Sequence, residues 1–446
     1  MKIHIRRLMD SNKFNERNSK LSPQKIIIMI KQISIFFALL FFGSFLQAQT
    51  IKTGVLVIGN TPGGLAAAVQ SARSGAKTMY LTQSLTLSPV FSEEDLPYIR
   101  HIRNHFYLKE RKKTKTTDSL ISAEIKLNQA LELVKNIADT VKNLSFNYNN
   151  VVSEIKQDGK GWEIRLKGGQ KIKADAVVDA TEKLNIASLI GTDLKKTMAT
   201  PVLNTNPLEN KLLRTAVATG YLYKTNNEQS LTYIPLGALI PASTENFITV
   251  PLLIGNLKAD KMSVGQAAGT IAAYCAFFKT STKSINIRVV QGELFAFNAE
   301  LIPYSDIDRS DPNFLAFQRL GLSGLMKSRI KNEDNLNKID FDTAGTVSAE
   351  DLLNPMKEFY TRSQIWFADN KAEKLTIADA ISLFMFTATR GEELKKEIEE
   401  GWSQSFKFNS KFDLERNITR KEFGILADRY LQPFNVRVDM AGNLQR

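Results

Sequence analysis

The sequence predicts an α/β fold followed by a helical C-terminal domain, and three observations support this. The apolar run at residues 55–58 leads into a glycine-rich turn, a helical stretch and a second apolar run, which is the order of a parallel βαβ unit. Residues 151–179 then alternate between apolar and polar side chains around two glycine turns, a pattern typical of an antiparallel β-meander. Beyond about residue 340, amphipathic helical patterns replace the strands.

The composition is that of an ordinary globular protein. The chain has 446 residues, of which 43% are hydrophobic and 24% charged, and this length favours two or three domains. Its net charge is +13, which falls to +7 when residues 1–48 are left out. No basic stripe with interleaved aromatic residues is present, so we expect no nucleic-acid partner. The single cysteine, Cys275, excludes an internal disulfide, and its apolar helical surroundings predict a buried thiol.

Residues 1–48 have the features of an export signal. The apolar run at residues 33–46 follows Lys31 and precedes Gln47-Ala48-Gln49, which predicts cleavage after Ala48. The run is shorter than the roughly 20 residues of a comfortable membrane span, so a membrane anchor is the alternative. Translation from Met29 would give a leader of ordinary length, and we expect the true start there. The mature protein is then exported to the periplasm or the cell exterior.

The glycine turn predicts a Rossmann-like, dinucleotide-binding domain. A strand at residues 55–58 runs into the turn 59–64, a helix follows at 65–73, and a second strand follows at 77–81. The first glycine permits the tight turn, the last lets the helix approach the strand, and the free N–H groups of the helix start attract a pyrophosphate. A helix packed on a sheet without any ligand is the alternative. The expected cofactor contacts here are Gly59, Thr61, Pro62, Gly63 and Gly64.

Two positions in this unit differ from the usual dinucleotide pattern. Thr61 replaces the second glycine, where its side chain crowds the phosphate and could also donate a hydrogen bond to it. The second strand usually ends in Asp or Glu, which binds the ribose hydroxyls. Here the chain has Thr82 and Gln83. Either side chain could bind a hydroxyl, but without the charge, so we expect weaker ribose binding.

Three segments together resemble a family of bacterial FAD-dependent oxidoreductases with the fingerprint G-G-T-P-A-G-x-A-A-A. The glycine turn is the first, residues 173–181 resemble the family's ADxVIDATG strand, and residues 263–273 resemble its GQAAGTAAA helix. The resemblance covers roughly residues 51–290 and implies FAD as the cofactor. Carried over to matching positions, it implies contacts from Val152 to the adenine and from Ala180, Thr181, Gly255, Asn256, Gly265 and Gln266 to other parts of the cofactor.

The departures from this family fall on its substrate side. Glu182 stands where the family strand motif ends in glycine, and Asn256 stands where the family has arginine. Residues 183–231 and 257–262 are short for substrate-facing segments. The resemblance implies an oxidoreductase acting on a small, carbohydrate-like substrate, although we can name no catalytic residue. The alternatives are a non-catalytic relative with a shortened substrate region and a site for a nicotinamide cofactor.

The rest of the chain completes the expected domain plan. Within the α/β domain (residues 49–290), residues 84–150 predict a polar helical insert, with apolar side chains at helical spacing between residues 120 and 141. Residues 291–340 are expected to link this domain to a helical domain at 341–446. Helices are predicted at 375–386 and 418–431.

Each predicted C-terminal helix opens with a capping-box pair. The pairs are Thr376 with Asp379 and Thr419 with Glu422. The pattern faintly resembles surface-layer-homology modules, which implies contact with the cell surface, and a generic helical domain is the alternative. His101 and His105 are spaced to share a helix face, but two ligands do not make a metal site. We therefore expect no metal.

Overall fold

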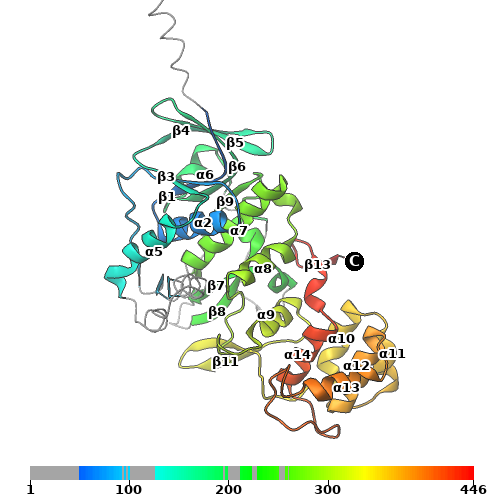
Figure 1. Ribbon diagram of the computed structural model, residues 1–446. Helices are drawn as coiled ribbons and strands as arrows, with labels where there is room; N and C mark the ends of the chain where they lie inside the picture. Colours follow the sequence, from blue (N-terminus) through cyan, green and yellow to red (C-terminus); the bar gives the residue numbers. More distant parts are fainter. Residues whose placement is uncertain are drawn as a thin grey trace, which may run out of the picture. The chain divides into compact units, whose positions relative to one another are not determined.

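The computed structural model confirms the predicted fold class: an α/β region with a mostly parallel sheet, followed by a region of several helices (Figure 1). The predicted leader and cleavage site, the two histidines at 101 and 105, and the pair Gly255-Asn256 lie outside the described residues. The structure describes residues 50–92, 95–96, 99–100, 126–193, 196–198, 211–223, 229–250, 257–259 and 261–445.

The main sheet has the strand order β3-β2-β1-β6-β5-β4, and β9 pairs with β6 outside this path. Strands β3, β2, β1, β6 and β9 run parallel. The carboxyl ends of parallel strands meet at one edge, and this edge is where ligands bind in such sheets. The parallel strands are β1 (Ile51–Gly59), β2 (Thr78–Leu81), β3 (Leu144–Asn147), β6 (Lys171–Ala180) and β9 (Phe247–Thr249).

The two halves of strand β6 pair with different strands. Its first half pairs antiparallel with β5 (Gly161–Leu166), which pairs antiparallel with β4 (Val152–Asp158) to form the predicted meander. Its second half pairs parallel with β9. A separate core, which contains Trp162 and Phe247, lies between the meander and the parallel sheet. The meander therefore covers one face of the parallel sheet.

Two helices pack tightly against each other over the parallel sheet. They are α2 (Pro62–Arg73) and α7 (Lys261–Phe278), which lie side by side in Figure 1. A Cβ atom on Gly265 would lie 2.0 Å from the Gly63 carbonyl oxygen, and one on Gly269 would lie 2.3 Å from the Ala67 oxygen. The two backbones are thus in direct contact, and only glycine fits at these two positions of α7.

The expected helical insert contains a strand as well as a helix. The helix α5 (Ala130–Asp139) follows a short 3-10 turn (Leu127–Gln129) and buries Val134 and Ile137. Residues 144–147, which we expected in the insert, form β3 and pair parallel with β2. The four residues alternate too briefly to reveal a strand from sequence alone, and the free edge of β2 supplies the pairing partner.

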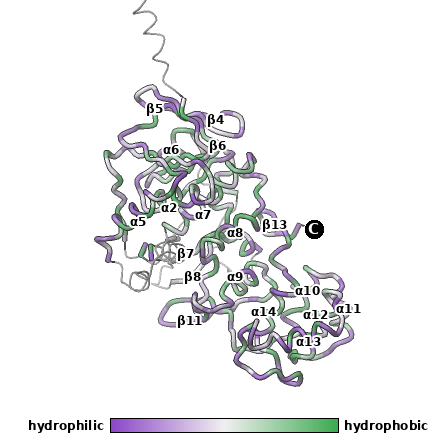
Figure 2. The backbone as a smooth tube through the Cα atoms, in the orientation of Figure 1, coloured by the Kyte–Doolittle hydropathy of each residue, from purple (hydrophilic) through white to green (hydrophobic). Residues whose placement is uncertain are grey.

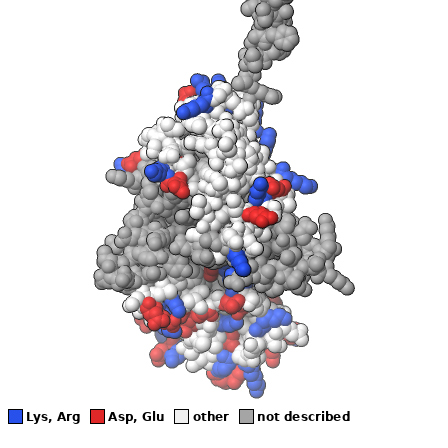
Figure 3. Space-filling view, turned by 90° about the vertical axis from the view of Figure 1, so that its left-hand side faces the viewer, with Lys and Arg blue, Asp and Glu red and all other residues white. Residues whose placement is uncertain are grey.

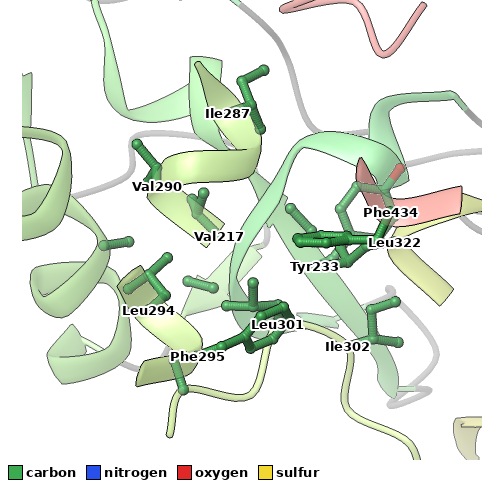
Figure 4. Packing of buried hydrophobic residues seen from close by; sticks show 14 of the residues in the cluster. Val217, Tyr233, Ile287, Val290, Leu294, Phe295, Leu301, Ile302, Leu322 and Phe434 are labelled. Atoms are coloured by element: carbon green, nitrogen blue, oxygen red, sulfur yellow. The ribbon is translucent and has the colours of Figure 1, made fainter. Parts of the chain in front are cut away.

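A second sheet follows, with the order β10-β7-β8-β12-β11. Residues 291–340, expected as a link, contain the helix α9 and the β11–β12 hairpin that completes this sheet. Figure 4 shows Leu294 and Phe295 packed beside Val217, Tyr233 and Phe434 in its core. The short helix α6 (Asn185–Leu189) precedes this sheet and packs in the core under the meander. The elements of the second sheet and around it are β7 (Ala216–Tyr223), β8 (Gln229–Pro235), β10 (Leu257–Ala259), β11 (Arg329–Glu333), β12 (Leu336–Asp340), α8 (Ile287–Ala296) and α9 (Phe314–Ser323).

The C-terminal region is a set of amphipathic helices, along which hydrophobic and hydrophilic residues alternate (Figure 2). Both predicted capping boxes are confirmed, at Thr376 and at Thr419. The elements are α10 (Ala349–Phe359), α11 (Ser363–Asp369), α12 (Ile377–Ala388), α13 (Glu393–Gly401), α14 (Arg420–Tyr430), and the short strands β13 (Arg437–Val438) and β14 (Leu444–Gln445).

The structure adds a third helix start of the same kind. The Ser348 side chain caps α10 by accepting a hydrogen bond from the Asp351 N–H. Single β-bridges connect the segments before the three capped helices: 346 with 419, 348 with 374, and 376 with 417. The starts of these three capped helices therefore lie close together. The sequence predicted only two of the three and did not predict that they meet.

Charge is distributed unevenly between the two regions. Residues 49–340 carry a net charge of +9 and residues 341–446 a net charge of −2. In the lower part of Figure 3, where the C-terminal helices lie, acidic and basic side chains are interspersed. Within the described part of the chain, no helix combines the length and the hydropathy needed to cross a membrane.

Candidate dinucleotide-binding site

The glycine turn lies where β1 and β6 end side by side. Gly59 pairs with Ala180 across the two strands and has a φ of +153°, a conformation that favours glycine. A Cβ on Gly59 would lie 2.4 Å from the Ala180 carbonyl oxygen, and one on Gly64 would lie 2.8 Å from the Ala180 Cβ. Both glycines therefore allow the turn and the start of α2 to lie directly on β6.

Thr61 holds the turn together by its side chain. Its hydroxyl donates a hydrogen bond to the Ala180 carbonyl oxygen (2.9 Å) and accepts one from the Gly64 N–H (3.0 Å), so Thr61 is the N-cap of α2. The hydroxyl hydrogen that we expected to reach a phosphate is therefore used inside the protein. Thr61 fixes the conformation of the turn, and the backbone is left to bind the ligand.

The start of α2 suits an anion. Pro62 occupies the first helical position and has no N–H to lose. The backbone N–H groups of Asn60 and Gly63 make no hydrogen bond to any residue that the structure describes. The first turn of α2 contains no acidic residue, and the helix dipole adds positive potential there. Two free donors at a helix start fit the pyrophosphate of a dinucleotide.

Tyr80 is a member of this site that the sequence reasoning missed. Its side chain is fully buried, and its Cε2 atom would lie 3.3 Å from a Cβ on Gly64. Burial raises the pKa of its hydroxyl above the ordinary value, and the Thr61 backbone N–H partly counteracts that rise. Among the described residues, no group makes a hydrogen bond of good geometry with this hydroxyl, so the Thr61 N–H is only a weak partner. The signal was a polar-tipped aromatic in the middle of a buried strand, a residue that usually finds a partner.

The end of β2 offers less to a ribose than we expected. Thr82 is only 1% exposed, and its hydroxyl accepts a hydrogen bond from the Ser84 N–H (3.1 Å). Gln83 is exposed. The segment after β2 turns back over the glycine turn, because the Asn60 amide donates to the Ser88 hydroxyl (2.9 Å). Of the two predicted ribose contacts, Gln83 alone therefore has a side chain open to solvent.

The carboxyl end of β6 is braced by a buried carboxylate. Asp179 accepts hydrogen bonds from the backbone N–H and hydroxyl of Thr181 (3.0 and 2.6 Å) and from the Ala187 N–H (2.8 Å). Burial raises the pKa of Asp179, and these hydrogen bonds partly oppose the rise. Through them Asp179 holds the loop that contains Thr181 and Glu182 at the edge of the site. Val152 is buried in the core under the meander.

The two residues predicted on the late helix face α2. Gly265 lies against Gly63, and the buried Gln266 side chain donates a hydrogen bond to the Gln70 side chain (3.1 Å). They support the turn from behind by fixing the position of α2. Direct contact of either residue with a cofactor stays a prediction.

The described residues provide few reactive groups outside this edge of the sheet. Cys275 is buried as predicted, and burial raises the pKa of its thiol to about 12, so it is protonated at neutral pH. No group of three metal-binding side chains occurs among the residues that the structure describes.

Together, these features define a dinucleotide-binding α/β domain. Residues 54–199 match the family model described as FAD dependent oxidoreductase, and this match indicates FAD as the cofactor. A search of curated protein sequences finds no match.

Similarity to solved structures is limited to part of the chain. It includes the anhydrotetracycline hydroxylase OxyS from Streptomyces rimosus (16% identity, TM-score 0.25, 32% of this chain and 34% of that one). It also includes the p-nitrophenol 4-monooxygenase PnpA from Pseudomonas putida (17% identity, TM-score 0.23, 32% of this chain and 44% of that one). A third example is GidA from Aquifex aeolicus (21% identity, TM-score 0.22, 29% of this chain and 25% of that one). The chain thus spans less than half the length of these proteins.

Proposed function

We propose that this chain is an FAD-dependent oxidoreductase of the cell envelope that oxidises a small, carbohydrate-like substrate. The observation that carries the proposal is the pair of free N–H groups at the glycine turn, which lies within the region that matches the oxidoreductase family. The apolar run at residues 33–46 supports export. The substrate class rests on the family resemblance alone.

The residues of the chain would bind and orient the cofactor. Bound FAD would supply the redox chemistry by accepting a hydride equivalent from the substrate. The Asn60 and Gly63 N–H groups would hold the pyrophosphate, and Gln83 would reach the ribose. Asp179 would keep the loop after β6 in one conformation beside the cofactor. The second sheet lies next along the chain and would carry the substrate side.

A second candidate is a relative that binds FAD weakly or not at all and has no turnover. Two observations favour it. The buried Thr82 leaves the end of β2 without a carboxylate for the ribose, and Glu182 occupies the place of a glycine beside the cofactor.

An absorbance spectrum of the purified full-length protein separates the two candidates. The enzyme is expected to carry a flavin spectrum that bleaches anaerobically when a reducing sugar or related alcohol is added. A colourless protein that does not take up added FAD would support the non-catalytic relative, as would a flavin that no candidate substrate bleaches.

Substitution of Gly64 tests the location of the site. Gly64→Val places side-chain atoms against Ala180 and Tyr80 and is expected to lower FAD affinity about 10- to 100-fold, because overpacking of this kind costs about 1–3 kcal/mol. Gly168→Val is the matched control, since a Cβ on Gly168 meets no atom within 4 Å. Equal FAD affinity in the two variants would show that the cofactor binds elsewhere.

A further inference from the structure

The main sheet carries a second feature at the edge opposite the glycine turn. A cavity of about 860 Å³ opens at the amino ends of β1 and β6, next to the turn before β2 and the C-terminal end of α7. Strand β1 runs from Lys52 at this cavity to Gly59 at the nucleotide turn. At about 3.3 Å per residue the two sites lie about 23 Å apart, so the cavity is separate from the cofactor site.

Lysines dominate the lining of this cavity. They are Lys52, Lys77, Lys160, Lys173 and Lys279, which together we call the lysine face. Two of the five are neutralised by aspartates of the same cavity: Lys173 pairs with Asp158 (2.8 Å) and Lys279 with Asp175 (2.7 Å).

The other three lysines leave a positive excess at this edge. Lys52, Lys77 and Lys160 are exposed and have no ion-pair partner in the part of the chain that the structure describes. The nearby carboxylate of Glu245 is already paired with Lys283 (2.8 Å). Three uncompensated cations therefore surround one opening.

An exposed aromatic pair stands at the rim of the lysine face. Phe277, which lines the cavity, is 66% exposed, and Phe278 is 55% exposed. Their rings contact each other edge to face, with centroids 5.0 Å apart. Such large apolar side chains are costly in water and suit a surface into which they can insert. Aromatic side chains next to lysines are the combination found on proteins that bind the surface of membranes.

The floor of the cavity favours an extended surface over a small ligand. The indole N–H of Trp162 already donates to the carbonyl oxygens of Glu245 and Asn246 (3.0 and 3.2 Å). Much of the remaining floor consists of small residues such as Gly54, Gly161 and Ala276. None of the buried, unpartnered side-chain polar atoms in the described residues belongs to this lining. The face thus offers charge and aromatic rings, without a set of buried donors shaped for one molecule.

In the sequence, an apolar segment shortly precedes the first lysine of this face. The run at residues 33–46 ends four residues before Thr50, and Lys52 follows two residues later. The C-terminal helices, with their net charge of −2, are less suited to an anionic surface.

We propose that the lysine face is a docking surface for an anionic phospholipid bilayer, with Phe277 and Phe278 inserted among the headgroups. This orientation directs the carboxyl edge of the sheet, with the glycine turn, away from the membrane and toward soluble substrates. The proposal stands on the lysines and the aromatic pair and does not depend on the proposed enzymatic activity.

Vesicle co-sedimentation of the full-length chain tests the proposal. Vesicles of 30% phosphatidylglycerol in phosphatidylcholine are compared with pure phosphatidylcholine at 0.1 M and 0.5 M salt. The apolar run would bind both compositions alike, and the basic residues before it favour the anionic vesicles equally in wild type and variants. The change in the ratio of the two partition coefficients between wild type and a lysine variant therefore measures the lysine face. Each lysine near an anionic surface contributes about fivefold. The three unpaired lysines are therefore expected to raise the ratio on the order of 100-fold at low salt, and less at high salt because the charges are screened.

Two sets of variants give the decisive comparison. Joint replacement of Lys52, Lys77 and Lys160 by glutamine is expected to reduce the ratio about 100-fold at low salt. The matched control replaces Lys371, Lys374 and Lys411, exposed lysines of the C-terminal region, and should keep the wild-type ratio. Replacement of Phe277 and Phe278 by serine is expected to lower binding to the anionic vesicles about tenfold without changing its salt dependence. Circular dichroism confirms that each variant is folded.

Three results would overturn the proposal. One is a wild-type ratio near 1, and another is a lysine variant that binds anionic vesicles as the wild type does. The third comes from sedimentation velocity without lipid. If the wild type is a dimer and the Phe277→Ser, Phe278→Ser variant is a monomer, a second copy of the chain covers this face instead of a membrane.

Discussion

The contact between α2 and α7 and the packing of the C-terminal helices are built in opposite ways. In the first, backbone meets backbone: Gly265 lies on Gly63 and Gly269 lies on Ala67, with no space for a side chain. In the second, large side chains fill the space between helices. Phe384 packs on Phe423 with ring centroids 5.1 Å apart, and the α9 residue Arg319 forms an ion pair with Asp428 of α14.

The difference follows from what each region has to hold. A dinucleotide site needs the start of α2 pressed against the sheet, so that free N–H groups point at the ligand, and small residues permit that approach. The C-terminal helices hold no such turn, and their arrangement depends on particular partner groups. We therefore expect the α2–α7 contact to be destabilised by any added side-chain atoms. We expect the C-terminal helices to be destabilised by removal of a hydrogen-bonding side chain.

A larger side chain in the α2–α7 contact should have the largest effect on stability and on FAD binding. In Gly265→Val the new Cβ would lie 2.0 Å from the Gly63 carbonyl oxygen, so the helices must separate. We expect a loss of about 3 kcal/mol or more in the free energy of unfolding and loss of FAD binding, measured by thermal unfolding and flavin absorbance. Gly292→Val in α8 is the control, because a Cβ there meets no atom within 4 Å. Equal melting temperatures would refute the backbone contact.

Removing a partner in the C-terminal region should have the next largest effect. The buried Arg420 guanidinium donates to the carbonyl oxygens of Phe341 (2.9 Å) and Lys327 (2.5 Å). Arg420→Met leaves both oxygens unpaired and should lower the free energy of unfolding by about 2–3 kcal/mol. FAD affinity at a temperature where the variant is folded should be unchanged. The exposed Arg429 provides the control, Arg429→Met. A variant that loses FAD affinity while folded would contradict the division between the two regions.

The smallest effect should appear as a pH dependence. Burial would raise the pKa of Glu422, but hydrogen bonds from Arg416, Ser410 and Thr419 outweigh burial and hold the pKa below its ordinary value. A carboxyl with a lowered folded pKa stabilises the protein above its unfolded pKa of about 4.3 and loses that contribution as the pH falls through the folded value. Asp179, whose pKa is raised, has the opposite sign, since acid removes the cost of its buried charge.

Glu422→Gln measures this contribution. At pH 7 we expect a loss of about 1–2 kcal/mol, because charge-assisted hydrogen bonds to the carboxylate become neutral ones. The difference in unfolding free energy between wild type and variant should shrink as the pH is lowered from 5 toward 3, measured by urea unfolding at each pH. A difference that stays constant over this range would mean that Glu422 does not titrate with a lowered pKa.

Local patterns predicted those parts of the fold whose causes are local. The strand 55–58, the glycine turn and the helix after it are contiguous, so their order alone indicates a βαβ unit, and the structure confirms it. The capping boxes at Thr376 and Thr419 join residues three apart and were predicted correctly. The third helix start, at Ser348, was missed because its repeat is weaker, and the bridges that relate it to the other two join distant residues.

Contacts between distant residues decided the details of the site. The sequence placed Thr61 at the turn, but not its hydrogen bond to Ala180, 119 residues away. It offered Thr82 and Gln83 as equal ribose contacts, and folding buried one and exposed the other. Tyr80 entered the site because the ring lies under Gly64. None of these outcomes has a local cause, so no local pattern could predict them.

By itself, the sequence determined the fold class, the glycine turn and the two capping boxes of this protein, because short-range geometry and periodicity specify them. The tertiary structure alone decided which polar groups of the turn remain free, since that depends on what β6 and the segment after β2 bring against it. It also decided that five lysines from separate elements meet at the opposite edge of the sheet. The burial of a group and the charge around it depend on residues that are distant in the sequence, so they are fixed only when the chain folds.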